Sequence, residues 1–317
     1  MKLLFILTLF TFSFESHGNI CLNFLAQRVE LTPENISKRV KYMPLGEELI
    51  PYLDMRPELP AKGAILLVSG FSKNMNSWMG QINDFVEKGY RVISFDQSNV
   101  GRSLLKNGIE HFGFGEGLEH DAYLGKALLK KLKVKKVTVV GHSRGGWVAA
   151  RIVDLLKRTK SIEIEKLVLA SPYVKYFWDS GMPGFTGNFF DLAFDFTLAF
   201  NPGAVGLSMG SSIKHSRKED IEGVSSDQRD RALGYILKGT NPGRNEQRST
   251  LSFVRSAVRR GLRVQVITDE NDRDLAPLRI VEALDIKGVD FSVLKGDEYS
   301  HYWPETHPEV FVKKVLD

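Results

Sequence analysis

The chain has 317 residues, a formal net charge of +5 at pH 7 and 43% hydrophobic residues. This composition excludes a disordered or fibrous protein and is sufficient for one large core or two modest ones. Lysine and arginine are spread along the sequence in short clusters, so no nucleic-acid partner is expected. The single cysteine, Cys21, excludes an intrachain disulfide.

The first eighteen residues have the order of features found in a secretory signal peptide. Lys2 is followed by the charge-free run Leu3–Phe14 and then by Ser16-His17-Gly18. Such a run is too short to cross a bilayer as a helix. We therefore predict that residues 1–18 are a cleaved signal peptide, that no membrane span remains after cleavage, and that the protein is periplasmic or secreted. An uncleaved N-terminal anchor is the alternative.

Strand and helix patterns follow one another through most of the remaining chain. Two strands, Arg39–Leu45 and Glu47–Leu53, meet at Gly46, and Ala64–Val68 reads as a buried strand. The alternation continues with helix 76–88, strand 91–95, helix 118–132, strand 137–141, helix 145–157 and strand 166–170, and resumes with strand 263–268, helix 275–284, strand 291–295 and helix 308–316. This order predicts an α/β fold, a mostly parallel sheet with helices on both faces and its active site at the carboxyl ends of the strands.

Residues 174–262 interrupt this alternation and are too long for a plain connection. We predict that they form an inserted helical cap between a first core part, residues 19–173, and a second core part, residues 263–317. Within the cap, Phe189 and Phe196 belong to an aromatic pattern at helical spacing. These rings either pack the cap onto the core or line an acyl-binding pocket, and in the second case Phe189 and Phe196 contact the substrate.

The motif Gly141-His142-Ser143-Arg144-Gly145-Gly146 lies between a predicted strand and a predicted helix. Glycines two residues before and after the serine permit a tight turn, and the N-terminus of the helix offers N–H groups to an oxyanion. A serine on a strand-to-helix turn of this kind is typical of a hydrolase nucleophile. The sequence thus predicts Ser143 as nucleophile, and the alternative is an ordinary turn that needs small residues.

A serine nucleophile needs a base within hydrogen-bonding reach and a third group that orients the base. His301 follows the last predicted strand and precedes Pro308, which begins the closing helix. The orienting acid is expected in residues 268–274, directly after the preceding strand. Asp272 is favoured there, and the neighbouring acids Asp269, Glu270 and Asp274 remain alternatives.

Together these motifs resemble the α/β-hydrolase superfamily from about Lys38 to the C-terminus, with the triad in the order Ser, Asp, His. Ser69-Gly70-Phe71 is similar to the family's His-Gly-Phe oxyanion loop, although Ser69 replaces the usual histidine. The resemblance implies an oxyanion hole built from the backbone N–H groups of Phe71 and Arg144. Trp78 occupies a position where the family often has tryptophan, and we predict that it contacts the substrate.

Two further motifs match the family with changes. The segment Asp96–Ser103 resembles its Asp-x-x-Gly-x-Gly-x-Ser turn, with Asn99 in place of a glycine; asparagine tolerates a positive φ better than most residues. The family has a glycine three residues before the acid, and this spacing selects Asp272, with Asp269 in the place of the glycine. The proline that follows the acid, Pro277, comes one residue late.

The resemblance implies a serine hydrolase that acts on a small-molecule substrate, a short to medium acyl ester, through an acyl-enzyme. No cofactor and no metal are expected, because one cysteine cannot build a thiolate site and the glycines form no phosphate-binding loop. We expect a monomer or weak dimer. Aminopeptidase, amidase or carbon-carbon hydrolase activity is the alternative within the fold, and a non-catalytic binding module is the alternative from another class.

Overall fold

The protein is described by a computed structural model that covers residues 31–32, 35–112, 116–174, 221–240, 249–272, 280 and 284–317. Residues Pro33–Asp317 form one compact unit. The predicted signal peptide and most of the predicted cap, including Phe189 and Phe196, lie outside the described residues. In the described part of the chain, no helix has the length and apolar character that a membrane crossing requires.

The centre of the fold is one eight-stranded sheet in the order β1-β2-β4-β3-β5-β6-β7-β8. The strands are β1 (Lys41–Leu45), β2 (Glu48–Met55), β3 (Ala64–Val68), β4 (Arg91–Phe95), β5 (Lys136–His142), β6 (Glu163–Ala170), β7 (Arg263–Asp269) and β8 (Val289–Leu294). Strands β1 and β2 form the predicted hairpin at Gly46, and β2 runs antiparallel to β4. All pairs from β4 to β8 are parallel, which confirms the predicted mostly parallel sheet.

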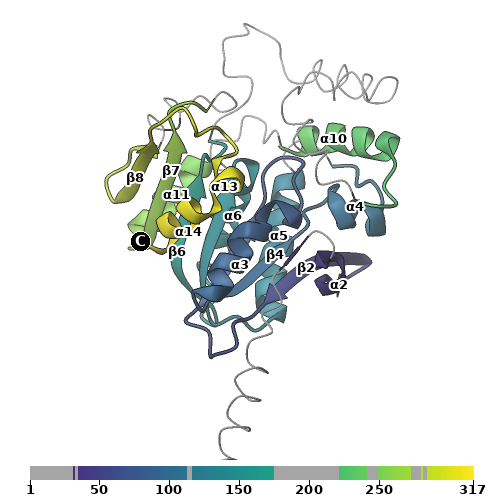
Figure 1. The fold of residues 1–317 in the computed structure, drawn as a ribbon, viewed down its shortest axis with the longest axis horizontal. Helices are drawn as coiled ribbons and strands as arrows, with labels where there is room; N and C mark the ends of the chain where they lie inside the picture. The colour runs from purple at the N-terminus through teal and green to yellow at the C-terminus, as the bar shows by residue number, and fades with distance from the viewer. Residues whose placement is uncertain are drawn as a thin grey trace, which may run out of the picture. The chain divides into compact units, whose positions relative to one another are not determined.

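Helices cover both faces of this sheet (Figure 1). They are α2 (Ile36–Arg39), α3 (Met79–Glu87), α4 (Gly101–Asn107), α5 (Glu116–Lys131), α6 (Arg144–Leu156), α10 (Ser226–Thr240), α11 (Thr250–Arg259), α13 (Trp303–Thr306) and α14 (Pro308–Leu316), with a 3-10 turn at Met75–Trp78. Helix α3 packs against α14, while α6 packs against both α5 and α11.

The side chains of β3 show why both faces need a cover. All five residues of this strand are buried, and successive side chains point to opposite faces of a sheet. Leu66 and Val68 join the large apolar cluster that also contains residues of α5, α6 and α11. Ile65 and Leu67, buried to 1% and 0% exposure, therefore face the side covered by α3 and α14. Such a continuous apolar strand is typical of a parallel sheet covered twice.

Helix α11 lies within the predicted cap in sequence, but it packs with the sheet domain. It contacts α6 and β7, and its residues Phe253, Val254 and Ala257 belong to the large apolar cluster. Their spacing of one, three and four residues gives one apolar helix face, which is the pattern of any helix lying on a core. Helix α11 thus contributes to the apolar core, and the bounds of the cap stay a prediction.

Candidate active site

The strand order reverses around β3, because β4 lies on one side of it and β5 on the other. In open parallel sheets, ligands bind outside the carboxyl ends of the strands at such a reversal. The two segments that leave the sheet here are the loop after β3, which begins at Ser69, and the turn after β5, which carries Ser143. The topology therefore places the predicted nucleophile and the predicted oxyanion loop next to each other.

Ser143 itself carries the strain of the turn. It precedes the first residue of α6 and has φ 54° and ψ −124°, a backbone conformation that few residues other than glycine adopt. Its amide N–H donates to Ala170 O at 3.0 Å, and its carbonyl accepts from Gly146 N–H at 2.8 Å and from Tyr173 N–H at 2.9 Å. These three backbone hydrogen bonds hold the strained residue in place between β5 and β6.

Gly141 and Gly145 are needed because neighbouring backbone segments approach them closely, and not because they have unusual dihedral angles. A Cβ atom at Gly141 would lie 2.2 Å from the carbonyl oxygen of Gly145. One at Gly145 would lie 2.3 Å from the carbonyl oxygens of Val68 and Ser69, at the end of β3. The glycines thus let α6 begin directly against the neighbouring strand, and this contact brings the oxyanion loop up to Ser143.

The structure brings the three predicted triad residues into one hydrogen-bonded chain. His301 Nε2 lies 2.9 Å from Ser143 Oγ, and His301 Nδ1 lies 2.8 Å from Asp272 Oδ2. Ser143, His301 and Asp272 are 7%, 6% and 3% exposed. With the Nδ1 proton donated to the carboxylate, Nε2 has a lone pair free to accept the serine proton, which is the arrangement that a base-activated nucleophile requires.

Glu270, one of the alternative acids, has a different partner. Glu270 accepts a hydrogen bond from the Gly296 N–H at 3.0 Å, and Asn271 Nδ2 donates to Gly296 O at 2.9 Å. These contacts join the acid loop to the loop that leads to His301. Asp274 lies outside the described residues.

Asp269 is a second carboxyl group close to the triad. It is the last residue of β7, is fully buried, and accepts a hydrogen bond from Ser171 Oγ at 3.3 Å. Burial, and then the charge of Asp272, raises the pKa of Asp269 to about 6. The sequence placed this residue where the family has a glycine, and the replacement adds a titratable group close to Asp272.

The side chain of His142 binds the backbone of the loop that carries His301. Its Nε2 lies 2.7 Å from the carbonyl oxygen of His301, and the two rings are 4.9 Å apart. Burial, and then the nearby His301, lowers the pKa of His142 to about 3. His142 is therefore neutral near pH 7, and its Nε2 acts as the donor to the carbonyl. The sequence motif contains His142 but does not indicate this contact, because His301 is 159 residues away.

The predicted oxyanion donors lie on the two segments that meet at Ser143. Arg144 is the first residue of α6, so its backbone N–H is one of those that a helix leaves without an acceptor in the helix. Phe71 follows Gly70, and a Cβ atom on Gly70 would lie 3.3 Å from Ser143 Cβ. The Phe71 segment thus runs directly beside the serine.

The loop after β3 is well held although Ser69 replaces the family's histidine. Ser69 Oγ donates to Asn74 O at 3.1 Å, which closes the loop on itself. Its carbonyl accepts a hydrogen bond from Gln97 Nε2 at 2.7 Å. Asp96 adds a further link, since its Oδ1 accepts from Met75 N–H at 2.8 Å. These contacts fix the backbone from which the Phe71 N–H projects.

The side chain of Arg144 connects this loop to α5 and α10. Its guanidinium group lies 2.7 Å from Asp121 Oδ2 and donates to Thr240 Oγ1 at 2.7 Å and to Gln97 Oε1. Arg144 and Asp121 are 4% and 0% exposed. Since Gln97 also holds Ser69 O, one buried polar network fixes both segments that carry the predicted oxyanion donors.

Trp78 does not lie where a substrate contact requires. Its side chain is 1% exposed and packs against Phe311 and His142, with ring centroids 5.4 and 6.4 Å away. It therefore supports the histidine turn from inside the core, which argues against the predicted contact with substrate. The predicted contacts Phe189 and Phe196 lie outside the described residues.

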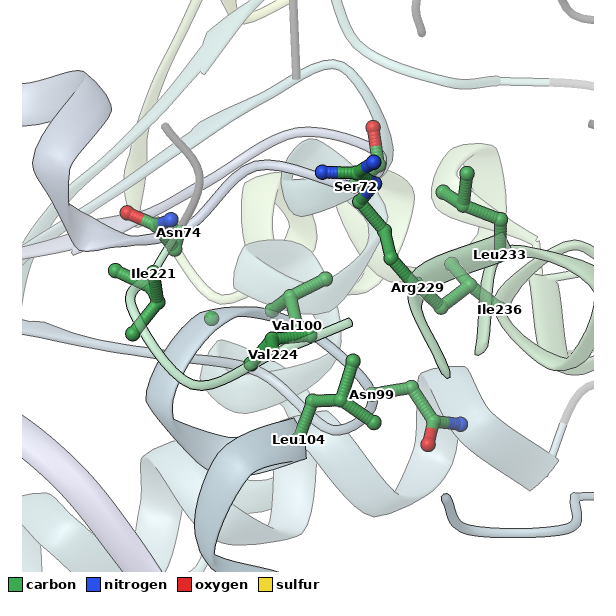
Figure 2. A pocket seen from close by; sticks show the side chains of 11 residues that line it. Ser72, Asn74, Asn99, Val100, Leu104, Ile221, Val224, Arg229, Leu233 and Ile236 are labelled. Atoms are coloured by element: carbon green, nitrogen blue, oxygen red, sulfur yellow. The ribbon is translucent and has the colours of Figure 1, made fainter. Parts of the chain in front are cut away.

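A small pocket of about 40 Å³ adjoins the oxyanion loop (Figure 2). Its apolar wall is formed by Val100, Leu233 and Ile236, against which Phe71 packs. Its lining residues are Ser72, Asn74, Asn99, Val100, Gly101, Leu104, Ile221, Val224, Arg229, Leu233 and Ile236. Helix α10, which belongs to the predicted cap, thus packs beside the loop that carries Phe71.

Comparisons with known proteins bear on the fold. The sequence profile of the alpha/beta hydrolase fold matches residues 63–214. A non-heme haloperoxidase from Rhodococcus erythropolis is 34% identical over 89 residues, which is 28% of this chain and 30% of that protein. A non-heme chloroperoxidase from Burkholderia pyrrocinia is 33% identical over 89 residues, again 28% and 30% of the two chains. Each match thus spans less than a third of the relative.

Solved structures resemble a larger part of the chain. An esterase from Exiguobacterium antarcticum superposes with a TM-score of 0.61 at 17% identity and covers 87% of this chain and 97% of its own. An enol-lactonase from Burkholderia xenovorans gives a TM-score of 0.60 at 15% identity, with coverage of 87% and 98%. At these identities the likeness establishes the fold.

The sheet order, the strand-to-helix turn at Ser143 and the profile match define an α/β hydrolase fold. The family-model match over residues 63–214 and this fold support the relation to the α/β-hydrolase superfamily that the sequence motifs predicted.

Proposed function

We propose that the protein is a serine hydrolase that cleaves short to medium acyl esters through an acyl-enzyme. The observation that carries this proposal is the hydrogen-bonded chain from Ser143 Oγ through His301 to Asp272, with distances of 2.9 and 2.8 Å. In the proposed reaction His301 removes the proton of Ser143 as the oxygen attacks the carbonyl carbon of the ester. Asp272 orients the imidazole and stabilises its positive charge.

The negative charge that develops on the carbonyl oxygen needs fixed donors. The N–H groups of Phe71 and Arg144 are proposed to supply them, and such preorganised donors contribute a large share of catalysis in this class of reaction. The imidazolium then protonates the leaving alcohol. Water, deprotonated by His301, hydrolyses the acyl-enzyme and restores Ser143.

The ester preference rests on the pocket beside the oxyanion loop. It is small and has an apolar wall of Val100, Leu233 and Ile236. This apolar wall beside the oxyanion loop is proposed to contact a short acyl chain. Amides are the alternative substrate class, because the same triad serves aminopeptidases and amidases.

Haloperoxidase activity is a second candidate function, because the two relatives described above are named a non-heme haloperoxidase and a non-heme chloroperoxidase. It is tested by the oxidation of bromide in the presence of hydrogen peroxide and an acyl donor. Loss of this activity in Ser143→Ala would show that it uses the same nucleophile.

The decisive experiment is labelling with a fluorophosphonate, followed by hydrolysis of p-nitrophenyl esters of increasing acyl length and of amino-acid p-nitroanilides. Ser143→Ala should abolish labelling and lower turnover about a thousandfold or more. Ser256→Ala, in α11, where the hydroxyl donates to Asp154 on α6, is the matched control and should label like the wild type. Labelling that persists in Ser143→Ala refutes the nucleophile, no labelling of the wild type favours a binding module, and faster cleavage of anilides moves the protein to the amidase alternative.

A further inference from the structure

A second group of chemically capable side chains lies apart from the triad. Glu48, Glu110 and His120 each offer one ligand atom, and these atoms all lie within 4.8 Å of one another. Glu48 begins β2, Glu110 follows α4, and His120 lies in α5. The three residues are far apart in sequence, so no spacing motif indicates that they lie together. The sequence accordingly led us to predict no metal.

We propose that Glu48, Glu110 and His120 bind one divalent transition-metal ion, of which Zn²⁺ is the representative. His120 Nε2 lies 3.0 Å from Glu48 Oε2 and 3.7 Å from Glu110 Oε2. Ligand atoms that surround a tetrahedral zinc ion at about 2.0–2.1 Å lie about 3.3 Å from one another. The observed separations lie on either side of this value, so small side-chain rotations admit the ion.

The chemistry of the ligands indicates the type of metal. An imidazole nitrogen together with two carboxylate oxygens suits zinc and its neighbours in the first transition row better than Ca²⁺ or Mg²⁺, which take oxygen ligands alone. The side chains of Glu48, Glu110 and His120 are 31%, 16% and 25% exposed, so water can complete the coordination. Three protein ligands and water form a common zinc arrangement.

The backbones of both glutamate segments are held by paired amide hydrogen bonds. Asn99 Nδ2 donates to Glu110 O at 2.8 Å, and Glu110 N–H donates to Asn99 Oδ1 at 2.7 Å. Asn107 binds Leu49, the neighbour of Glu48, in the same two-sided way, at 3.0 and 3.1 Å. The carboxylates are thus presented by fixed backbones, which reduces the entropy lost when a metal binds.

A buried hydroxyl group is also directed toward this group of residues. Ser98 is 3% exposed and its hydroxyl lies by the Glu110 carboxylate, whose pKa it lowers. Among the described residues, it makes no hydrogen bond of normal geometry. Two carboxylates face a single imidazole here, so a dication would balance their charge.

The proposed ion would join β2, α5 and the segment after α4, and the last of these is tied to the pocket beside the oxyanion loop. Asn99 holds Glu110 with its side chain and lines the pocket of Figure 2. Glu48 and His120 add β2 and α5. The metal is therefore proposed as a structural ion that fixes one wall of the pocket, and this role is independent of the proposed hydrolase reaction.

The test is calorimetric titration of EDTA-treated full-length protein with ZnCl₂. We expect one ion per chain and a rise in melting temperature on zinc addition, because a ligand that binds only the folded state stabilises it. Glu110→Gln and His120→Ala should each weaken zinc binding by about a hundredfold or more. His111→Ala is the matched control, since His111 adjoins Glu110 but stacks on Tyr235 instead, and it should bind zinc like the wild type.

The absorption spectrum of bound Co²⁺ tests which residues are the metal ligands. Co²⁺ bound at the wild-type site should give visible absorption bands with one-to-one stoichiometry, and these bands should be lost in His120→Ala. Melting of all variants in EDTA verifies that they fold. Absence of zinc binding up to about 1 mM, a concentration typical of the weakest biological cation sites, would leave only an ion-paired histidine and overturn the proposal. Zinc binding that survives both substitutions, or equal affinity for Ca²⁺, would overturn it as well.

Discussion

Replacing Arg144 with methionine is the sharpest test of the buried network behind the oxyanion loop. The variant keeps the backbone N–H and most of the side-chain volume, but it removes the guanidinium group that lies 2.7 Å from Asp121. Asp121 would keep its hydrogen bond from Ser98 N–H, at 2.8 Å, and lose its counter-charge. Breaking a buried pair from one side costs about 3–5 kcal/mol, since the remaining charge stays uncompensated.

Arg151 provides the control on the same helix. It also has two carboxylate partners at 2.8 Å, Glu119 and Asp154, but its side chain is 21% exposed. Water screens such a pair, so Arg151→Met should cost about 1 kcal/mol or less. The contrast between the two variants isolates burial, because residue type, helix and pair distance are nearly the same.

The assay is urea unfolding at pH 7, followed by tryptophan fluorescence. Adding Asp121→Asn to Arg144→Met removes the uncompensated charge and should restore part of the lost free energy, a coupling that a double-mutant cycle measures directly. If Arg144→Met costs no more than Arg151→Met, the network does not stabilise the fold as argued. If Asp121→Asn makes the double variant worse, the buried charge is not the cause of the loss.

The remaining predictions concern the acid loop and the glycines. Asp272→Asn should retain the fold and lower kcat about ten-thousandfold. Glu270 binds the Gly296 N–H, so the control Glu270→Gln should leave kcat close to wild type. Equal losses of p-nitrophenyl ester turnover in the two variants would refute the triad assignment. Asp269 has a pKa raised to about 6 in the folded protein, above about 3.9 in the unfolded chain, so its ionisation destabilises the fold as pH rises through this interval. Asp269→Asn should therefore raise the free energy of unfolding at about pH 8 and leave it unchanged at about pH 3.5, below both values; an equal change at both pH values in urea unfolding would contradict this. Gly145→Ala places a methyl group 2.3 Å from two carbonyl oxygens and should lower the free energy of unfolding by about 3 kcal/mol or more. In the control Gly46→Ala the new methyl group has open space, so only the positive φ of residue 46 costs stability, about 1 kcal/mol. Similar losses for the two variants in chemical denaturation would show that the turn at Ser143 can adapt.

Much of the sheet could be predicted because the apolar character of a buried strand can be recognised in its own sequence. The runs Ala64–Val68 and Arg91–Phe95 form strands with the predicted bounds, since a doubly covered strand needs apolar residues throughout. The left-handed conformation expected at Asn99 is confirmed by its φ of 64°. Helix α4 was missed, because its seven residues begin inside the motif Asp96–Ser103 and carry no long apolar pattern.

The contacts of the site could be predicted only in part. Sequence indicated Ser143, His301 and Asp272 because each follows a strand, and parallel strands end at the same edge of the sheet. It could not indicate that His142 binds the backbone of His301 or that Arg144 reaches Thr240, because such contacts depend on how separate elements pack. Trp78 was wrongly placed for a related reason, since a large apolar side chain looks the same in sequence whether it lines a pocket or fills a core.

The segment that carries His301 is fastened to the first half of the chain at several points. Lys73 Nζ forms an ion pair with Glu305 at 2.9 Å, Gln81 Nε2 donates to Pro304 O, and His142 donates to His301 O. The two ends of the Lys73–Glu305 contact are 232 residues apart. Closing contacts of such long range is slow, and the segment of His301 is synthesised after the turn of Ser143. The nascent polypeptide consequently has Ser143 before its proposed base, and the proposed esterase becomes competent only when the segment of His301 has docked.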